Sequence, residues 1–207
     1  MRVWLAAALA LICLAPRGAA AQDGSMEAAV LAEINWARAH PAEYAGMLRE
    51  YRSYFSGKLV QVPGDDIGVM TFEGARAVDE AIAYVERQKP MAPLGENARL
   101  DQAAADYVAE TGQAGVVGHV GPSGRTLMQR IRSVGVWPGL AGEDIAYGPQ
   151  TAEAVARQLI IDDGVPSRGH RTAIFDPAYR VAGVGCGPHR VYRSMCVIDF
   201  AGALVER

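Results

Sequence analysis

The sequence predicts an α+β protein in which helices cover a small, mostly antiparallel sheet. Three observations lead to this prediction. Apolar residues recur at helical spacing through most of the chain, strand-like segments cluster near its end, and no internal repeat divides it. The 207 residues are 50 % apolar and 21 % charged, a composition typical of a globular domain rather than a disordered chain.

The first 21 residues have the features of a secretory signal peptide. An apolar run from Val3 to Leu14 follows Arg2, and small residues at 19–21 form a cleavage site. The run is too short to cross a bilayer as a helix, so we expect no membrane span. Cleavage would leave a single domain, residues 22–207, in a secreted or periplasmic location. Because the leader carries two arginines and no acid, this 186-residue domain has a formal charge of −5.

The front of the domain reads as helices with recognisable ends. Ser25 is a candidate N-cap for the first helix, and Pro41 should end that helix and begin a second. Residues 57–68 predict a loop or a short hairpin, because glycines, a proline and paired aspartates interrupt them. Thr71 is expected to cap a third helix that stops before Pro90.

The middle of the domain alternates helices with glycine-rich loops. Asn97 should cap a long helix, and five glycines between residues 112 and 124 then break the helical pattern. Ser123 is expected to restart a helix. Residues 142–148 are bounded by glycines and predict a loop leading into a strand, after which Thr151 should cap another helix.

The end of the chain predicts a polar turn at residues 166–171 and then two strands, from about Tyr179 to Cys186 and a second ending near Ala201. Cys186 and Cys196 are the cysteines outside the leader, and an exported compartment favours a disulfide between them. A tight turn directly after Cys186 would place Cys196 roughly 17 Å away, beyond disulfide reach. A bridge would then need a loop over residues 187–195; two reduced cysteines are the alternative.

Composition and motifs exclude several classes of function. Lys58 and Lys89 are the only lysines, and neither lies in a basic cluster, so the chain lacks the basic face of a nucleic-acid-binding protein. No phosphate-binding glycine loop, dinucleotide fingerprint, Gly-x-Ser-x-Gly elbow or His-Glu-x-x-His pair is present. The ten-residue cysteine spacing is neither a redox pair nor a zinc knuckle.

Two of the four histidines are candidates for a functional site. His40 precedes a proline at a helix junction and is expected on the surface, and His189 is expected in a solvated loop. His119 and His170 each follow a glycine in segments too glycine-rich or too polar to be core. We expect both imidazoles to face a cleft.

Acidic residues accompany these two histidines along the chain. Glu143 lies in a glycine-framed segment, and Asp162 and Asp163 end the helix upstream of His170. Two imidazoles with one or two carboxylates could hold a divalent ion or polarise water. The alternative is that each histidine only satisfies backbone carbonyls in its own loop.

Several motifs in order resemble the CAP superfamily, which contains cysteine-rich secretory proteins, antigen 5 and pathogenesis-related protein 1. The resemblance covers about residues 28–201 and rests on Asn35-x-x-Arg38, Gly118-His119, Gly142-Glu143-Asp144-Ile145-Ala146, Gly169-His170-Arg171, Asp176-Pro177 and Val181-Ala182-Gly183-Val184-Gly185-Cys186. It implies a three-layer α-β-α sandwich with a shallow cleft. It also implies that His119 and His170 are the family's paired histidines, able to bind Zn²⁺ or another divalent ion, and that Glu143 is its cleft glutamate.

The sequence departs from the family pattern at two acidic positions. Asp144 stands where the family usually has asparagine, which is expected to add a negative charge beside the cleft. The second cleft acid falls at Asp162 or Asp163, shorter than glutamate by one methylene, so metal affinity is expected to be weaker. Residues 160–171 resemble the bacterial secreted branch, and the disulfide-rich animal extensions are missing.

The resemblance is compatible with three functions. The first is an extracellular binding module with a metal in its cleft and a lipid, glycan or protein ligand; the second is a metal-dependent hydrolase of peptide or cell-wall bonds. The third is a purely structural cleft. We favour binding, because the sequence indicates neither an oxyanion stabiliser nor a substrate groove and identifies no catalytic residue.

Two further groups of side chains could contribute to the site. Arg168 and Arg171 flank His170, and we expect them to be solvated or to pair with Asp162 and Asp163. An aromatic group could line a groove for lipid or simply pack in the core; its members are Tyr44, Tyr51, Tyr54 and Phe55.

Overall fold

The structure, a computed structural model, describes residues 25–206, so the predicted signal peptide lies outside the described residues. Its centre is a four-stranded sheet with the order β4 (Gly95–Glu96), β7 (Val181–His189), β8 (Arg193–Ala201) and β6 (Ala141–Tyr147). β8 pairs antiparallel with both β7 and β6, and the short β4 pairs parallel with β7. The mostly antiparallel sheet is therefore confirmed.

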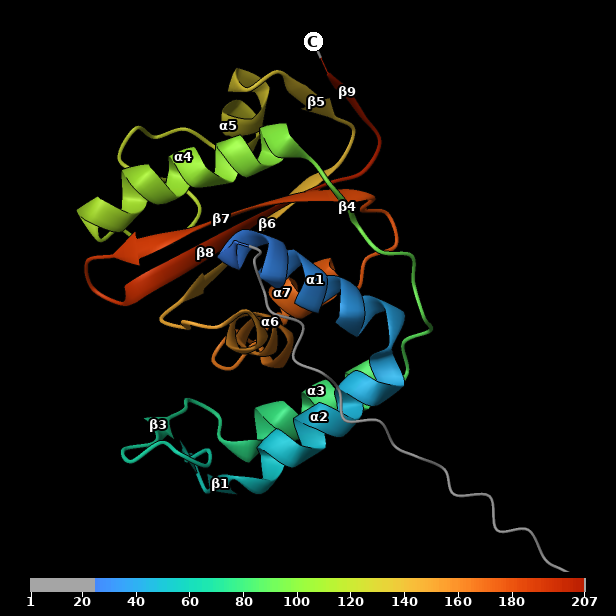
Figure 1. Cartoon of the computed structure of the whole chain (residues 1–207), viewed down its shortest axis with the longest axis vertical. Helices are drawn as coiled ribbons and strands as arrows, with labels where there is room; N and C mark the ends of the chain where they lie inside the picture. The colour runs from blue at the N-terminus through green and yellow to red at the C-terminus, as the bar shows by residue number, and fades with distance from the viewer. Residues whose placement is uncertain (1–24, 207) are drawn as a thin grey trace, which may run out of the picture.

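Helices cover both faces of this sheet, which confirms the three-layer α-β-α sandwich (Figure 1). One face carries α4 (Ala98–Ala114) and α5 (Leu127–Ser133). The other carries α1 (Met26–Ala39), α6 (Ala152–Ile161) and α7 (Gly169–Ile174). None of the helices in residues 25–206 is both long and apolar enough to cross a membrane.

Alternating glycines on β7 let α4 lie directly on the sheet. A Cβ at Gly183 would lie 2.2 Å from the backbone nitrogen of Asp101, and one at Gly185 would lie 2.5 Å from that of Ala105. Side chains on a strand alternate between the two faces, so these glycines leave the α4 face of β7 flat while Ala182 and Val184 face the opposite core. The glycines in the segment 181–186 therefore serve packing.

Beyond the sandwich, α2 (Pro41–Ser53) and α3 (Ala75–Val85) form an antiparallel pair joined by a small sheet (Figure 1). That sheet contains β1 (Phe55–Ser56), β2 (Leu59–Val60) and β3 (Val69–Met70), which bears out the hairpin interpretation of this segment. At the other end of the molecule, β5 (Val136–Pro138) pairs with β9 (Leu204–Glu206).

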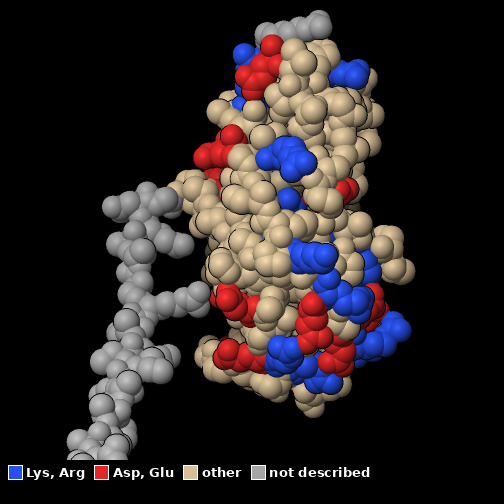
Figure 2. Space-filling view, turned by 90° about the vertical axis from the view of Figure 1, so that its right-hand side faces the viewer, with Lys and Arg blue, Asp and Glu red and all other residues tan. Residues whose placement is uncertain are grey.

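The surface carries charges of both signs. Figure 2 shows basic and acidic side chains intermingled on one face.

Two of the expected N-caps are wrong. Thr71 instead donates its hydroxyl to the carbonyl of Lys58, and α3 begins later, after Gly74. Ser123 is likewise replaced by Thr126, which forms a capping box with Gln129 at the start of α5. Each predicted position precedes the true cap by three residues, because turn residues lie between the first capping candidate and the helix.

Two elements near the candidate site were also mispredicted. Residues 142–148 form most of strand β6 rather than a loop, because Gly142 lies against Tyr179 and the segment pairs with β8 in continuous register. Residues 166–171, predicted as a polar turn, include the start of α7. The polar side chains of this segment are buried in ion pairs instead of being solvated, which hid the helix from a hydrophobicity pattern.

The predicted disulfide is present, by a route that the sequence did not suggest. Cys186 and Cys196 lie opposite each other on β7 and β8, with an S–S distance of 2.10 Å. Neither a tight turn directly after Cys186 nor a loop over residues 187–195 forms. Both strands extend past the cysteines, and the chain turns only at residues 190–192. The bridge therefore links directly facing strand positions.

Candidate functional site

His119 lies in the loop after α4, held by two tyrosines. The hydroxyl of Tyr107 donates to the carbonyl of Gly118 at 2.8 Å, and the amide of Gly118 donates to the hydroxyl of Tyr147 at 3.0 Å. Gly118 has a φ of 97°, a conformation that favours glycine, which explains the residue that precedes the histidine. The imidazole is left 57 % exposed at the cleft.

Glu143, on strand β6, fixes the orientation of this imidazole. Its Oε1 lies 2.8 Å from Nδ1 of His119, and its side chain is only 2 % exposed. The other carboxylate oxygen forms an ion pair with Arg130, a buried arginine on α5. Arg130 also donates to the carbonyl of His119 at 3.0 Å and lies 3.6 Å from the ring centre of Tyr107. Sequence reasoning missed Arg130, because it lies in a helix that was judged by its apolar residues alone.

His170 is held in the same way at the start of α7. Its Nδ1 lies 2.6 Å from Oδ1 of Asp162, whose side chain is 1 % exposed. The second oxygen of Asp162 accepts the backbone amide of His170 at 3.0 Å. Asp162 ends α6 with a left-handed φ of 60°, which turns its carboxylate back toward the following helix.

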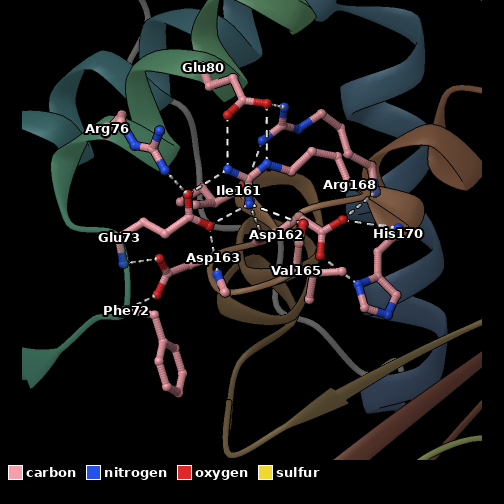
Figure 3. Close-up of polar contacts among 12 residues, drawn as sticks. Phe72, Glu73, Arg76, Glu80, Ile161, Asp162, Asp163, Val165, Arg168 and His170 are labelled. Carbon is pink, nitrogen blue, oxygen red and sulfur yellow. Dashed lines mark hydrogen bonds and ion pairs between the residues drawn. The ribbon is translucent and has the colours of Figure 1, made fainter.

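The structure distinguishes the two candidate aspartates. Asp162 contacts the cleft histidine, whereas the side chain of Asp163 accepts the backbone amides of Phe72 and Glu73 at 2.7 and 2.8 Å (Figure 3). Asp163 lines the cleft but ties it to the segment before α3. The cleft acids that contact histidines are therefore Glu143 and Asp162.

Arg168 and Arg171 do not use their expected partners. In what we call the arginine cluster, Arg168 donates to Glu73 and Glu80 of the α3 region (Figure 3). Arg171 also belongs to it and lies 3.4 Å from Glu80. Pairing with Asp162 and Asp163 side chains was wrong, because α3 and the segment before it pack beside this loop and supply Glu80 and Glu73. Arg168 also donates to the carbonyl of Asp162 at 2.7 Å, so the cluster braces the loop between Asp162 and His170.

The arginine cluster has a clear electrostatic consequence. Hydrogen bonds from Arg168 and from the amide of Gly164 lower the pKa of Glu73 to about 2. In turn, the carboxylates of Glu73 and Glu80 raise the pKa of Arg168. Both groups stay charged at all ordinary pH values, so the brace persists across the physiological range.

Asp144 does not add the expected negative charge to the cleft. It follows Glu143 on β6 and so faces the opposite side of the sheet, where it is 2 % exposed and its Oδ2 has no hydrogen-bond partner. Burial, with the nearby charge of Asp162, raises its pKa well above the usual value. The neutral acid is favoured at this position.

The remaining two histidines lie outside the site. His40 is half exposed, 3.1 Å from Glu43, which confirms a surface position. The solvated-loop prediction for His189 is wrong, because the side chain is 2 % exposed. Its Nδ1 accepts the backbone amides of Val191 and Tyr192 at 3.2 and 3.1 Å and closes the β7–β8 turn.

The two site histidines line one cleft of about 320 Å³. Within residues 25–206, no hydrogen bond engages Nε2 of either ring, since both use Nδ1 for their carboxylates. In the same described part of the chain, no group of three or more His, Cys, Asp or Glu side chains is placed to hold a metal ion. The protein therefore offers two imidazoles, one from the loop after α4 and one from the start of α7, both lining the same cleft.

An apolar groove of about 480 Å³ adjoins this cleft. The two share Tyr147, Gln158 and Asp163 as lining residues. The predicted aromatic group does not act as one set: Tyr51 and Phe55 line the groove, and Tyr44 is buried in the core. Tyr54 does neither, and its hydroxyl donates to Glu50. Three further lining side chains are large, apolar and largely exposed, namely Val69 (58 %), Met70 (70 %) and Phe72 (75 %).

Comparison with known proteins places residues 31–200 within the model of the Cysteine-rich secretory protein family, CAP. No curated protein matches the chain in sequence. Among solved structures, an outer surface protein from Borrelia burgdorferi is 21 % identical with a TM-score of 0.45, over 54 % of this chain and 79 % of that protein. An extracellular protein containing an SCP domain from Bacillus anthracis is 21 % identical with a TM-score of 0.44, over 62 % of this chain and 38 % of that protein.

Proposed function

The chain belongs to the cysteine-rich secretory protein family, and from this premise we propose that it is a secreted binding protein whose cleft holds a divalent metal ion between His119 and His170. The observation that carries the proposal is that a buried carboxylate engages Nδ1 of each imidazole. Metal-binding histidines usually donate their second nitrogen to such a group, which fixes the ring and leaves the other nitrogen for the metal.

The side chains present suit such an ion with open coordination positions. Two imidazoles are suitable ligands for Zn²⁺, but a closed structural zinc site takes four protein ligands. Glu143 and Asp162 orient the histidines from behind and are not spare ligands. Water or a bound ligand would complete the coordination, and we expect weaker affinity than at a closed site.

The hydrolase alternative receives less support from these contacts. A metal-dependent hydrolase needs a carboxylate free to accept a proton from water. Here Glu143 is committed to His119 and Arg130, and Asp162 to His170. Asp163, the remaining acid at the cleft, accepts two backbone amides.

Zinc titration calorimetry on the full exported protein tests the metal proposal. We expect saturable binding by the wild type and its loss in His119→Ala/His170→Ala. His40→Ala is the matched control, because His40 is exposed and distant from the cleft in the chain, and it should bind as the wild type does. Equal binding by the double variant would overturn the metal site.

For the ligand, the apolar groove favours a lipid-like molecule over a glycan. A polar end could reach the histidine cleft through the shared residues while an alkyl chain lies along Phe55, Val69 and Phe72. Burying a methylene contributes about 0.8 kcal/mol, so each methylene added between hexanoate and decanoate should tighten Kd about fourfold. Affinity independent of chain length would argue against this ligand class.

A matched pair of variants checks the groove itself. Phe72→Ser should weaken decanoate binding about tenfold, equivalent to about 1.4 kcal/mol. Ile67→Ser is the control, because Ile67 is 86 % exposed in the same segment but does not line the groove. Equal effects of the two variants would refute the assignment.

We also propose export to a secreted or periplasmic location. Support comes from the leader pattern at residues 1–21 and from the bridge between Cys186 and Cys196, which suits an oxidising compartment. N-terminal sequencing of the exported protein should start near Gln22. An intact leader on protein retained in the cytoplasm would contradict the proposal.

A further inference from the structure

Unpartnered polar atoms gather beneath the His119 side of the cleft. Four buried side-chain nitrogen or oxygen atoms among the described residues have no hydrogen-bond partner, and three of them belong to Arg130 and Asp199: Nε of the arginine and both carboxyl oxygens of the aspartate. Asp199 is 0 % exposed. Buried polar groups are nearly always hydrogen-bonded, so a fully buried carboxyl with two free oxygens needs an explanation.

The strand register places Asp199 beside Glu143. The two residues lie directly opposite each other on β8 and β6, so their side chains share one face of the sheet. On the other side, Asp199 lies opposite Gly183, which supplies no side chain. Because the backbone of α4 lies against Gly183, this helix covers that side of the carboxyl.

Few charged groups face Asp199. Glu143 faces it from β6 and Arg130 from α5. β7 contributes no charged side chain at the paired position, which is Gly183. Arg130 is paired with Glu143, so an ionised Asp199 would add a second, uncompensated negative charge at a fully buried position. Two adjacent carboxyl groups avoid this by sharing one proton.

We propose that Asp199 is a positioning residue that keeps its proton and donates it in a hydrogen bond to Glu143. Asp199, Glu143 and His119 then form one hydrogen-bonded chain from the middle of the sheet to the cleft. Burial and the charge of Glu143 raise the pKa of Asp199, while Arg130 opposes them, in keeping with a neutral acid. The chain holds the Glu143 carboxylate on His119 whether or not a metal binds.

Infrared difference spectroscopy on the metal-free protein at neutral pH tests the location of the proton. The spectrum of the wild type minus that of Asp199→Asn should contain the carbonyl band of one protonated carboxylic acid, shifted in D₂O. Carboxylate bands in that difference would overturn the proposal. Because no zinc is present, this result does not depend on whether the proposed metal site exists.

The positioning role is tested by the Nδ1 proton resonance of His119, which reports its hydrogen bond to Glu143. Asp199→Asn keeps a donor and should retain the resonance, whereas Asp199→Leu removes the donor and should shift or broaden it. Asp144→Asn, a neighbouring buried acid on the opposite face, is the control and should leave it unchanged. An unchanged resonance in the leucine variant, or its loss in the asparagine variant, would overturn the positioning role of Asp199. If the leucine variant does not fold, the asparagine variant and the infrared band decide.

Discussion

Replacing Glu73 by glutamine should loosen the loop that joins Asp162, at the end of α6, to His170, at the start of α7. Glu73 accepts two hydrogen bonds from Arg168 and one from the amide of Gly164, so it connects α3 to that loop. Glutamine keeps the shape and a neutral acceptor but removes the charge. The substitution therefore isolates the electrostatic contribution of Glu73 to this connection.

The magnitude follows from the lowered pKa of Glu73. A change from 4.5 to about 2 corresponds to roughly 3 kcal/mol at neutral pH. Because Glu73 is still 15 % exposed and lies close to solvent, screening reduces this value, and we expect Glu73→Gln to cost about 1–2 kcal/mol of unfolding free energy. A carboxyl group whose pKa is lowered by folding stabilises the fold at pH values above its pKa in the unfolded chain. The cost should be complete above pH 4.5 and should shrink as the pH falls toward 2.

Urea unfolding at several pH values between 3 and 7 measures this cost, and amide hydrogen exchange at Gly164 reports the loop directly. Glu153→Gln is the matched control, because it removes an exposed ion pair with Arg157 and should cost less than about 0.5 kcal/mol. Equal costs for the two variants at pH 7, or a cost for Glu73→Gln that does not change with pH, would refute the reasoning.

Three further predictions concern single sites in the sheet. Asp144→Asn should raise the unfolding free energy at pH 7 by about 1–2 kcal/mol, because the folded wild type holds a proton that the unfolded chain releases. This gain should vanish below about pH 4, and a pH-independent effect in urea titrations would contradict the prediction. Gly183→Ala should abolish folding or cost more than about 3 kcal/mol, since its Cβ would lie 2.2 Å from the backbone of Asp101, and circular dichroism melting that matches the wild type would disprove the close approach. Cys186→Ser/Cys196→Ser should cost about 2–3 kcal/mol in urea unfolding, as expected for a ten-residue separation, and unchanged stability would count against a bridging role.

The fold was predictable where sequence pattern and packing agree. Caps at Ser25, Asn97 and Thr151 start their helices as expected, because each side chain accepts a backbone amide in the first turn. The prediction failed where burial is polar. The start of α7 looked like a turn because Arg168 and Arg171 are hydrophilic, yet their partners lie about ninety residues away on α3.

The candidate site was predictable only as far as motifs extend. Gly118-His119 and Gly169-His170 identified both histidines, and the structure brings each onto a carboxylate. Arg130 and Asp199 carry no local signal. One is an arginine among helical residues and the other an acid in a strand, and only the register of β6 with β8 brings Asp199 beside Glu143.

The most direct test of the central claim is a crystal structure of the exported protein grown with zinc, with anomalous diffraction recorded at the zinc absorption edge. We expect one strong peak in the cleft, bonded to Nε2 of His119 and Nε2 of His170, with Glu143 and Asp162 still on the Nδ1 atoms. A cleft without zinc, or zinc bound only at surface residues away from both histidines, would contradict the account.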